Sequence, residues 1–151
     1  MNYDLILRNA RLRSGKIAEI AIAKGRITSI GESVGSSAGQ IIDAQRNLVT
    51  EPFVNAHLHL DKVMTGSLAE EAVLGQYHGG EMSGAMTAIE IASKVKEHYV
   101  ESEIVARVRE LLLKAEHYGI SHIRAFADVD TKAKLIGVKA LLKMKKEFKR
   151  R

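Results

Sequence analysis

Ten consecutive residues, Pro52-Phe53-Val54-Asn55-Ala56-His57-Leu58-His59-Leu60-Asp61, carry more structural information than any other part of this chain. They read as an apolar strand that ends in two histidines one residue apart. Because successive side chains of a strand point to opposite faces, His57 and His59 share one face, whereas Leu58 and Leu60 face the packing side. Two neutral imidazoles on one face can chelate a single transition-metal ion. The alternative is that hydrogen bonds near a strand end satisfy both histidines.

The residues before this motif form a series of short segments with β-type sequence, at 4–12, 17–23, 26–30 and 41–44. Within the second segment apolar and smaller or polar side chains alternate, and Lys24-Gly25 then provides a turn. Alternation with a period of two, followed by a glycine-bearing turn, predicts a β-hairpin.

Helical periodicity follows the motif. Apolar residues recur at helical spacing over 102–118, where Ser102 is the expected N-cap and Gly119 the expected end of the helix. Residues 120–127 read as a buried strand, and a last helix is expected from Lys132. The order of strand, helix, strand and helix predicts a parallel sheet and an α/β fold class.

Two further segments lie between the motif and this helix. The connection at 63–86 is rich in glycine and carries His78, and a connection of this length is usually functional or mobile. In a barrel it would cover the pocket. The opposing interpretation treats His78 as a solvated loop residue. Residues 89–99 again have helical periodicity.

A second motif is His122-Ile123-Arg124-Ala125-Phe126-Ala127-Asp128-Val129-Asp130. With His57-Leu58-His59-Leu60-Asp61-Lys62 and the earlier Ile41-Ile42-Asp43-Ala44, it resembles the amidohydrolase superfamily, in particular the branch of cytosine deaminase and N-isopropylammelide amidohydrolase. The resemblance implies a partial β-sandwich at 1–50, then the first two β/α units of a TIM-type barrel, left incomplete, at 51–151. Branch members carry Thr, His and Val where this chain has Ala125, Phe126 and Ala127, which puts the substrate class in doubt.

The resemblance also implies a chemistry. His57 and His59 would bind one divalent metal ion, zinc or iron, and the enzyme would hydrolyse a non-peptide C–N bond by deaminating an aminated heterocycle. The expected substrate is a small aminated pyrimidine or triazine-like ring. No residue of this chain is assigned as the catalytic acid or base.

Four charged residues near the two motifs have competing interpretations. By resemblance, Asp61 and Lys62 are substrate-proximal, with Lys62 holding an anionic or carbonyl-bearing group; otherwise they form a surface ion pair of little energetic value. Asp128 and Asp130 would either complete the metal site or cap the helix expected from Lys132. The capping interpretation is favoured here.

Length argues against a complete enzyme. A (β/α) barrel takes about 250 residues, whereas this chain has 151. We therefore expect an N-terminal fragment that is inactive alone and is completed by a missing C-terminal polypeptide or in a homo-oligomer. The alternative is a non-catalytic remnant or interaction module that oligomerises through exposed strand edges.

Composition excludes several other classes. With 46% hydrophobic and 27% charged residues the chain is expected to fold, and the absence of cysteine excludes disulfides and thiolate metal sites. No signal peptide or membrane span is recognised, so a cytoplasmic protein without a membrane partner is expected. The basic C-terminal segment is interpreted as the solvated side of an amphipathic helix, not as a nucleic-acid site. The apolar face expected for this helix comprises Leu135, Val138, Leu142, Met144 and Phe148.

Overall fold

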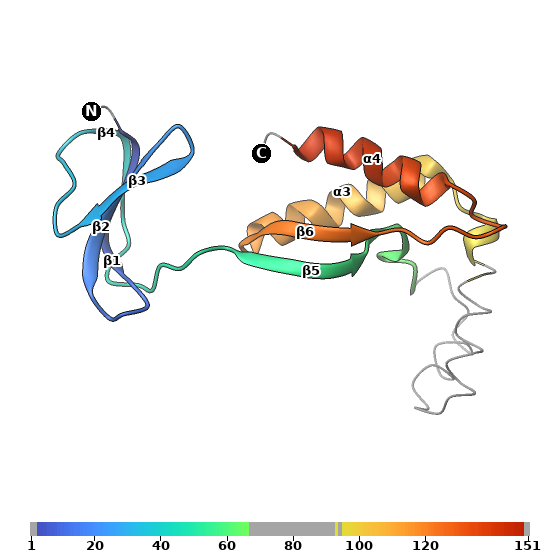
Figure 1. Cartoon of the computed structure of the whole chain (residues 1–151), viewed down its shortest axis with the longest axis horizontal. Helices are drawn as coiled ribbons and strands as arrows, with labels where there is room; N and C mark the ends of the chain where they lie inside the picture. Colours follow the sequence, from blue (N-terminus) through green and yellow to red (C-terminus); the bar gives the residue numbers. More distant parts are fainter. Residues whose placement is uncertain (1–2, 67–92, 94, 150–151) are drawn as a thin grey trace, which may run out of the picture. The chain divides into compact units, whose positions relative to one another are not determined.

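The computed structural model describes residues 3–66, 93 and 95–149. The chain divides into two compact units, Met1–Glu51 and Pro52–Arg151 (Figure 1). Most of the connection predicted at 63–86, including His78, and residues 89–92 and 94 of the helix predicted at 89–99 lie outside the described residues. No helix within the described ranges is both long and apolar enough to cross a membrane.

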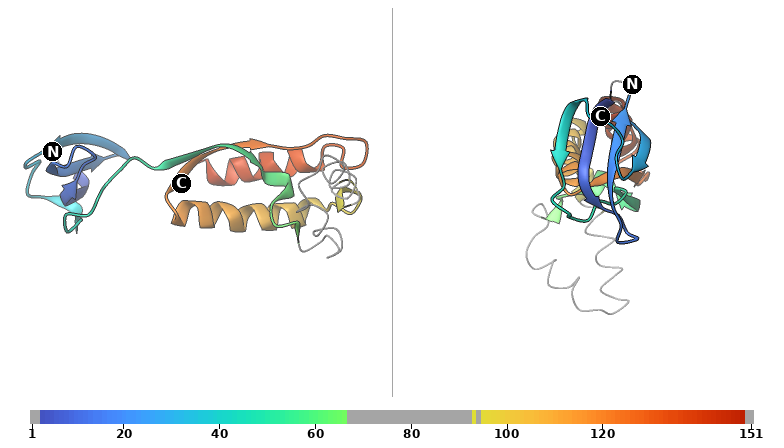
Figure 2. Two further views of the ribbon diagram at one scale, coloured as in Figure 1. Left: turned by 90° about the horizontal axis from the view of Figure 1, so that it is seen from below. Right: turned by 90° about the vertical axis from the view of Figure 1, so that its left-hand side faces the viewer.

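The first unit contains one mixed four-stranded sheet. Its strand order is β3-β2-β1-β4, in which β1 pairs antiparallel with β2 and parallel with β4, and β2 pairs antiparallel with β3. The strands are β1 (Tyr3–Arg11), β2 (Ile17–Ala23), β3 (Arg26–Gly31) and β4 (Ala38–Asp43). Figure 2 (right) shows these strands side by side.

The predicted hairpin is confirmed in β2 and β3. Lys24 and Gly25 form the turn with φ angles of 52° and 70°. Two successive residues with positive φ are typical of the turn that best fits the right-handed twist of a hairpin. Ile6, Ala10 and Ala21 are fully buried in this unit.

The second unit contains a pair of parallel strands. The strands are β5 (Phe53–His59) and β6 (Ile120–Phe126), with Asn55 opposite Ile123 and His59 opposite Phe126. A short 3₁₀ helix, η1 (Leu60–Lys62), follows β5 directly. The α-helices α3 (Glu101–His117) and α4 (Ile136–Phe148) lie against one face of the strand pair (Figures 1 and 2). The parallel pairing predicted from the sequence is therefore confirmed.

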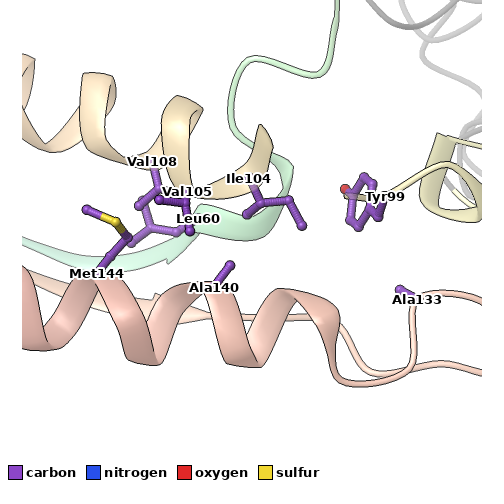
Figure 3. Close-up of a cluster of buried hydrophobic side chains, with 8 residues drawn as sticks. All are labelled: Leu60, Tyr99, Ile104, Val105, Val108, Ala133, Ala140 and Met144. Carbon is purple, nitrogen blue, oxygen red and sulfur yellow. The ribbon is translucent and has the colours of Figure 1, made fainter. Parts of the chain in front are cut away.

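A hydrophobic cluster joins η1, α3 and α4. Ile104 and Val108 of α3 are fully buried, and Met144 of α4 and Leu60 of η1 are nearly so (Figure 3). Burying such a side chain contributes roughly 1.5–3 kcal/mol. Because Leu60 directly follows the two histidines, this cluster fixes the end of β5 against the helices.

Two predicted helix boundaries are wrong. Helix α3 begins at Glu101 after Val100, and no side chain caps it, so Ser102 is not an N-cap. Helix α4 begins at Ile136 instead of Lys132, because turns occupy residues 131–135 and Lys134 adopts a positive φ of 49°.

The predicted apolar face of α4 is wrong in part. Leu135 and Leu142 are 52% and 55% exposed, whereas Gly137 and Ala140 are buried together with Met144. The helix packs through its smallest residues, because a Cβ placed on Gly137 would lie only 3.1 Å from Cβ of Asp61. Helix α4 therefore lies close to η1 at Gly137, and the larger side chains of Leu135 and Leu142 remain exposed.

Candidate metal centre

Strand β5 presents both histidines of the motif on the face opposite the helices. Leu58 packs toward the hydrophobic cluster, whereas both flanking imidazoles lie against the ring of Phe126 in β6, although the pairing of the two strands is irregular between Asn55 and Leu58. The ring centroids of His57 and His59 are 5.2 Å apart, and the planes are tilted by 51°. His57 is exposed, and the side chain of His59 is 38% exposed.

Phe126 of β6 lies against both imidazoles. The strand register places it opposite His59, with ring centroids 5.7 Å apart. Its ring stacks on that of His57 at 4.2 Å with an interplanar angle of 19°. The guanidinium of Arg124 lies 5.4 Å from the Phe126 centroid. An aromatic side chain therefore occupies the position next to the histidine pair.

The carboxylate of Asp128, two residues beyond β6, connects three side chains. Its Oδ1 lies 3.1 Å from Nδ1 of His59, although the two atoms are not aligned as a hydrogen bond. Its Oδ2 accepts hydrogen bonds from Nζ of Lys62 at 2.9 Å and of Lys96 at 2.7 Å. Burial favours a raised pKa for Asp128, but hydrogen bonds and charges from the two lysines outweigh it and lower the pKa to about 2.

Lys96 also donates to Oδ2 of Asp130 at 3.0 Å, and it is only 8% exposed. The pKa of Lys96 is raised: burial acts in the opposite direction, but the hydrogen bonds to the two aspartates prevail. The sequence interpretation missed this residue. A lysine within a helical pattern ordinarily points to solvent, and nothing in the local periodicity distinguishes Lys96 from exposed lysines.

The two aspartates after β6 have different roles. Oδ1 of Asp130 accepts hydrogen bonds from the backbone N–H groups of Lys132 and Ala133 at 2.9 and 2.8 Å, so it caps the turn that precedes α4. The favoured interpretation as a helix cap was therefore wrong for Asp128, which faces His59 and the lysines. Asp130 caps the turn before α4, but it does not cap α4 itself, which begins at Ile136 without a side-chain cap.

Asp61 is a buried carboxylate behind the histidines, 1% exposed. Its Oδ2 accepts a hydrogen bond from the backbone N–H of Asp128 at 3.2 Å. Its Oδ1 is buried and has no hydrogen-bond partner among the described residues. Burial raises the pKa of this carboxyl group. Asp61 therefore connects the segment after β5 to the segment after β6. The side chain of Lys62, which is 33% exposed, pairs with Asp128 and not with Asp61.

The described residues offer two overlapping sets of donors for a metal ion. His59, Asp61 and Asp128 have ligand atoms within 4.8 Å of one another, and His57 lies outside this group. The second set is the histidine pair itself. Two imidazoles bound to one zinc through bonds of about 2.1 Å at a tetrahedral angle would have ring centroids roughly 5 Å apart. The observed 5.2 Å fits this separation.

Comparison with known proteins places this chain in a family. No family profile matches the chain. The chain is 33% identical to an N-isopropylammelide isopropyl amidohydrolase of a Pseudomonas species over 98% of its own length and 36% of that enzyme. A crystal structure of 5-methylcytosine deaminase from Klebsiella pneumoniae, liganded with 5-fluorocytosine, superposes with a TM-score of 0.75 at 27% identity, covering 94% of this chain and 33% of that one.

A structure of N-isopropylammelide isopropylaminohydrolase from Burkholderia multivorans matches the fold at a TM-score of 0.71 and 22% identity. The chain belongs to the amidohydrolase superfamily, which confirms the resemblance found in the sequence. It spans about a third of the length of these relatives and corresponds to an N-terminal portion of such an enzyme.

Proposed function

We propose that this chain provides the metal-binding part of a hydrolase that acts on non-peptide C–N bonds and deaminates an aminated heterocycle. The observation that carries the proposal is the histidine pair, with ring centroids 5.2 Å apart on one face at the end of β5. A similar solved structure is named as a 5-methylcytosine deaminase, and a relative similar in sequence as an N-isopropylammelide isopropyl amidohydrolase. An aminated pyrimidine or triazine-like ring is accordingly the proposed substrate class.

His57 and His59 are the proposed ligands of one divalent ion, zinc or iron, which when bound would lower the pKa of a water molecule to about 7. Asp128 is the less suitable ligand, because its Oδ2 already faces two ammonium groups that would repel a cation. Its Oδ1 instead lies beside Nδ1 of His59. A carboxylate in that place would fix the tautomer and orientation of a ligating imidazole once Nδ1–H and Oδ1 align as a hydrogen bond.

Lys62 and Asp61 have separate proposed roles at the edge of the pocket. The side chain of Lys62 is one-third exposed, so we propose that its ammonium donates a hydrogen bond to a carbonyl or anionic group of a substrate while it holds Asp128. Asp61 is buried, and it orients the backbone of Asp128 through the hydrogen bond from that N–H group. The described residues supply no assigned acid or base for the leaving amine.

We further propose that 1–50 is part of a β-sandwich and that 51–151 begins a (β/α) barrel. An apolar groove of about 850 Å³ supports this arrangement, because it runs along β6 beside α4 and is lined by Leu141, Leu142 and Phe148. A further strand and helix of the same enzyme would cover it. The activity would then need this additional polypeptide, and a cytoplasmic location remains a prediction from the sequence.

One observation favours the alternative of an oligomerising, non-catalytic module. Among the described strands, β3 and β4 form the edges of the first sheet, and they expose Ile27, Ile30, Ile41 and Ile42 by 41–62%. Exposed apolar edge strands pair readily with other chains. The reading frame beyond Arg151 separates the two proposals. A continuation with further histidine and aspartate motifs supports the hydrolase, and a stop codon without a companion gene supports the module.

The direct test of function is release of ammonia from cytosine, 5-methylcytosine and aminated triazines, with zinc or iron supplied. The assay is performed on the chain together with any continuation that the reading frame supplies. A His57→Ala, His59→Ala double variant is the matched control. Activity that disappears in the double variant supports the proposal, and equal activity in both proteins contradicts it.

A further inference from the structure

The inference concerns how the ring of His57 is held. Among the described residues, the imidazole of His57 has no hydrogen bond, although its backbone N–H donates to Oδ1 of Asn55 at 3.2 Å. His59 differs, because its Nδ1 lies beside the carboxylate of Asp128. An exposed imidazole without such a partner would turn freely about two side-chain bonds. The contacts that limit its orientation are therefore those with neighbouring rings.

Phe126 supplies the closest of these contacts. Its ring is nearly parallel to the imidazole of His57, at a centroid distance of 4.2 Å, whereas the two histidine rings are 5.2 Å apart and strongly tilted. Aromatic pairs prefer such stacked arrangements, and a stacked neighbour favours rotamers that keep the planes together. A phenyl ring has no donor or acceptor, so Phe126 can neither bind an ion nor transfer a proton.

The position of Phe126 is itself fixed by the backbone. The parallel register pairs it with His59, and Asp128, two residues later, is held by Lys62 and Lys96. The end of β6 is thus anchored on the same side as the histidines. A ring carried by this segment is a rigid support for the more exposed ring of His57.

We propose that Phe126 is a positioning residue that holds the imidazole of His57 in the orientation needed to share one divalent metal ion with His59. The inference rests on the proposed metal site. It explains how an exposed histidine without a polar partner can act as a ligand. Loss of a partner that orients a metal ligand typically weakens metal binding about 10-fold to 100-fold.

The experiment compares three variants of the full chain with the unsubstituted protein by titration with Co²⁺, followed by absorption and calorimetry. Phe126→Leu removes the flat ring, Phe126→Tyr retains it, and Phe53→Leu changes a phenylalanine that is 66% exposed at the start of β5. We expect Phe126→Leu to weaken Co²⁺ binding by about 10-fold or more. Phe126→Tyr and Phe53→Leu should remain near the original affinity. Circular dichroism checks that each variant keeps its helices.

A second readout needs no metal. Ring currents of a stacked phenyl shift the carbon-bound imidazole protons of His57 upfield in NMR spectra, and a His57→Ala variant assigns these signals. Phe126→Leu should move them downfield, while the signals of His98 and His117 stay in place. A folded Phe126→Leu variant with unchanged Co²⁺ affinity overturns the proposal. If the unsubstituted chain binds no Co²⁺, the proposed metal site is contradicted. The NMR comparison then still tests the stacking, which is refuted if the chemical shifts of the His57 protons are the same in Phe126→Leu as in the unsubstituted chain.

Discussion

Replacement of Lys96 by methionine tests whether the charge network behind the histidines holds the second unit together. Methionine keeps much of the apolar stem but removes the ammonium group. The change deletes the hydrogen bonds of 2.7 Å to Asp128 and 3.0 Å to Asp130. The ammonium is well shielded, since the Lys96 side chain is only 10% exposed.

The expected loss follows from what remains at each aspartate. Removing one partner of a hydrogen bond to a charged group costs about 1.5–3 kcal/mol when the other is left unsatisfied. Asp128 keeps Lys62, and Asp130 keeps the two backbone amides of its turn, so each loss falls near the lower limit. We expect Lys96→Met to lower the free energy of unfolding by about 3 kcal/mol in total.

The assay is urea unfolding followed by far-UV circular dichroism, which reports α3 and α4 of the second unit. Lys114→Met is the control, because Lys114 pairs with Glu110 on an exposed helix face where both side chains are more than half exposed. That substitution should cost less than about 0.5 kcal/mol. Equal losses for the two variants would refute the reasoning, because the network would then contribute no more than a surface ion pair.

Two other predictions concern acid and packing. The folded-state pKa of Asp128, about 2, lies below the ordinary value of 3.8 for an aspartate, so its contribution to stability is present above about pH 4 and is lost as the pH falls toward 2. Asp128→Asn should therefore flatten the dependence of unfolding free energy on pH in this window for the metal-free protein. An unchanged profile would contradict the assignment. Gly137→Ala would place a Cβ 3.1 Å from Cβ of Asp61, so we expect a loss of about 1–3 kcal/mol in urea unfolding despite the better helix propensity of alanine, whereas a gain in stability would count against the close packing.

The geometry of the histidine pair could be predicted from the sequence because it depends on local rules. Alternation along a strand places His57 and His59 on one face without any knowledge of the rest of the fold. The parallel pairing of β5 and β6 also followed from the order of elements, with Gly119 ending the helix between them at a φ of 77°. Both inferences need only the periodicity of neighbouring residues.

The surroundings of the pair could not be predicted in the same way, because they depend on contacts between distant segments. Lys96 meets an aspartate 32 positions away, and Lys62 meets the same aspartate 66 positions away. The capping role of Asp130 was easier to interpret, since the backbone amides that its Oδ1 accepts from lie within the next three residues. The buried face of α4 was misassigned because Gly137 carries no hydrophobic signal, yet its lack of a side chain allows the approach to Asp61.

The metal content of the purified 151-residue chain, after incubation with zinc or iron and removal of excess ion, tests the central claim most directly. The His57→Ala, His59→Ala double variant is measured in parallel, with its fold checked by circular dichroism. We predict close to one bound ion per chain, lost in the folded double variant. No bound ion in the unsubstituted protein, or an equal amount in both proteins, would contradict the assignment of His57 and His59 as metal ligands.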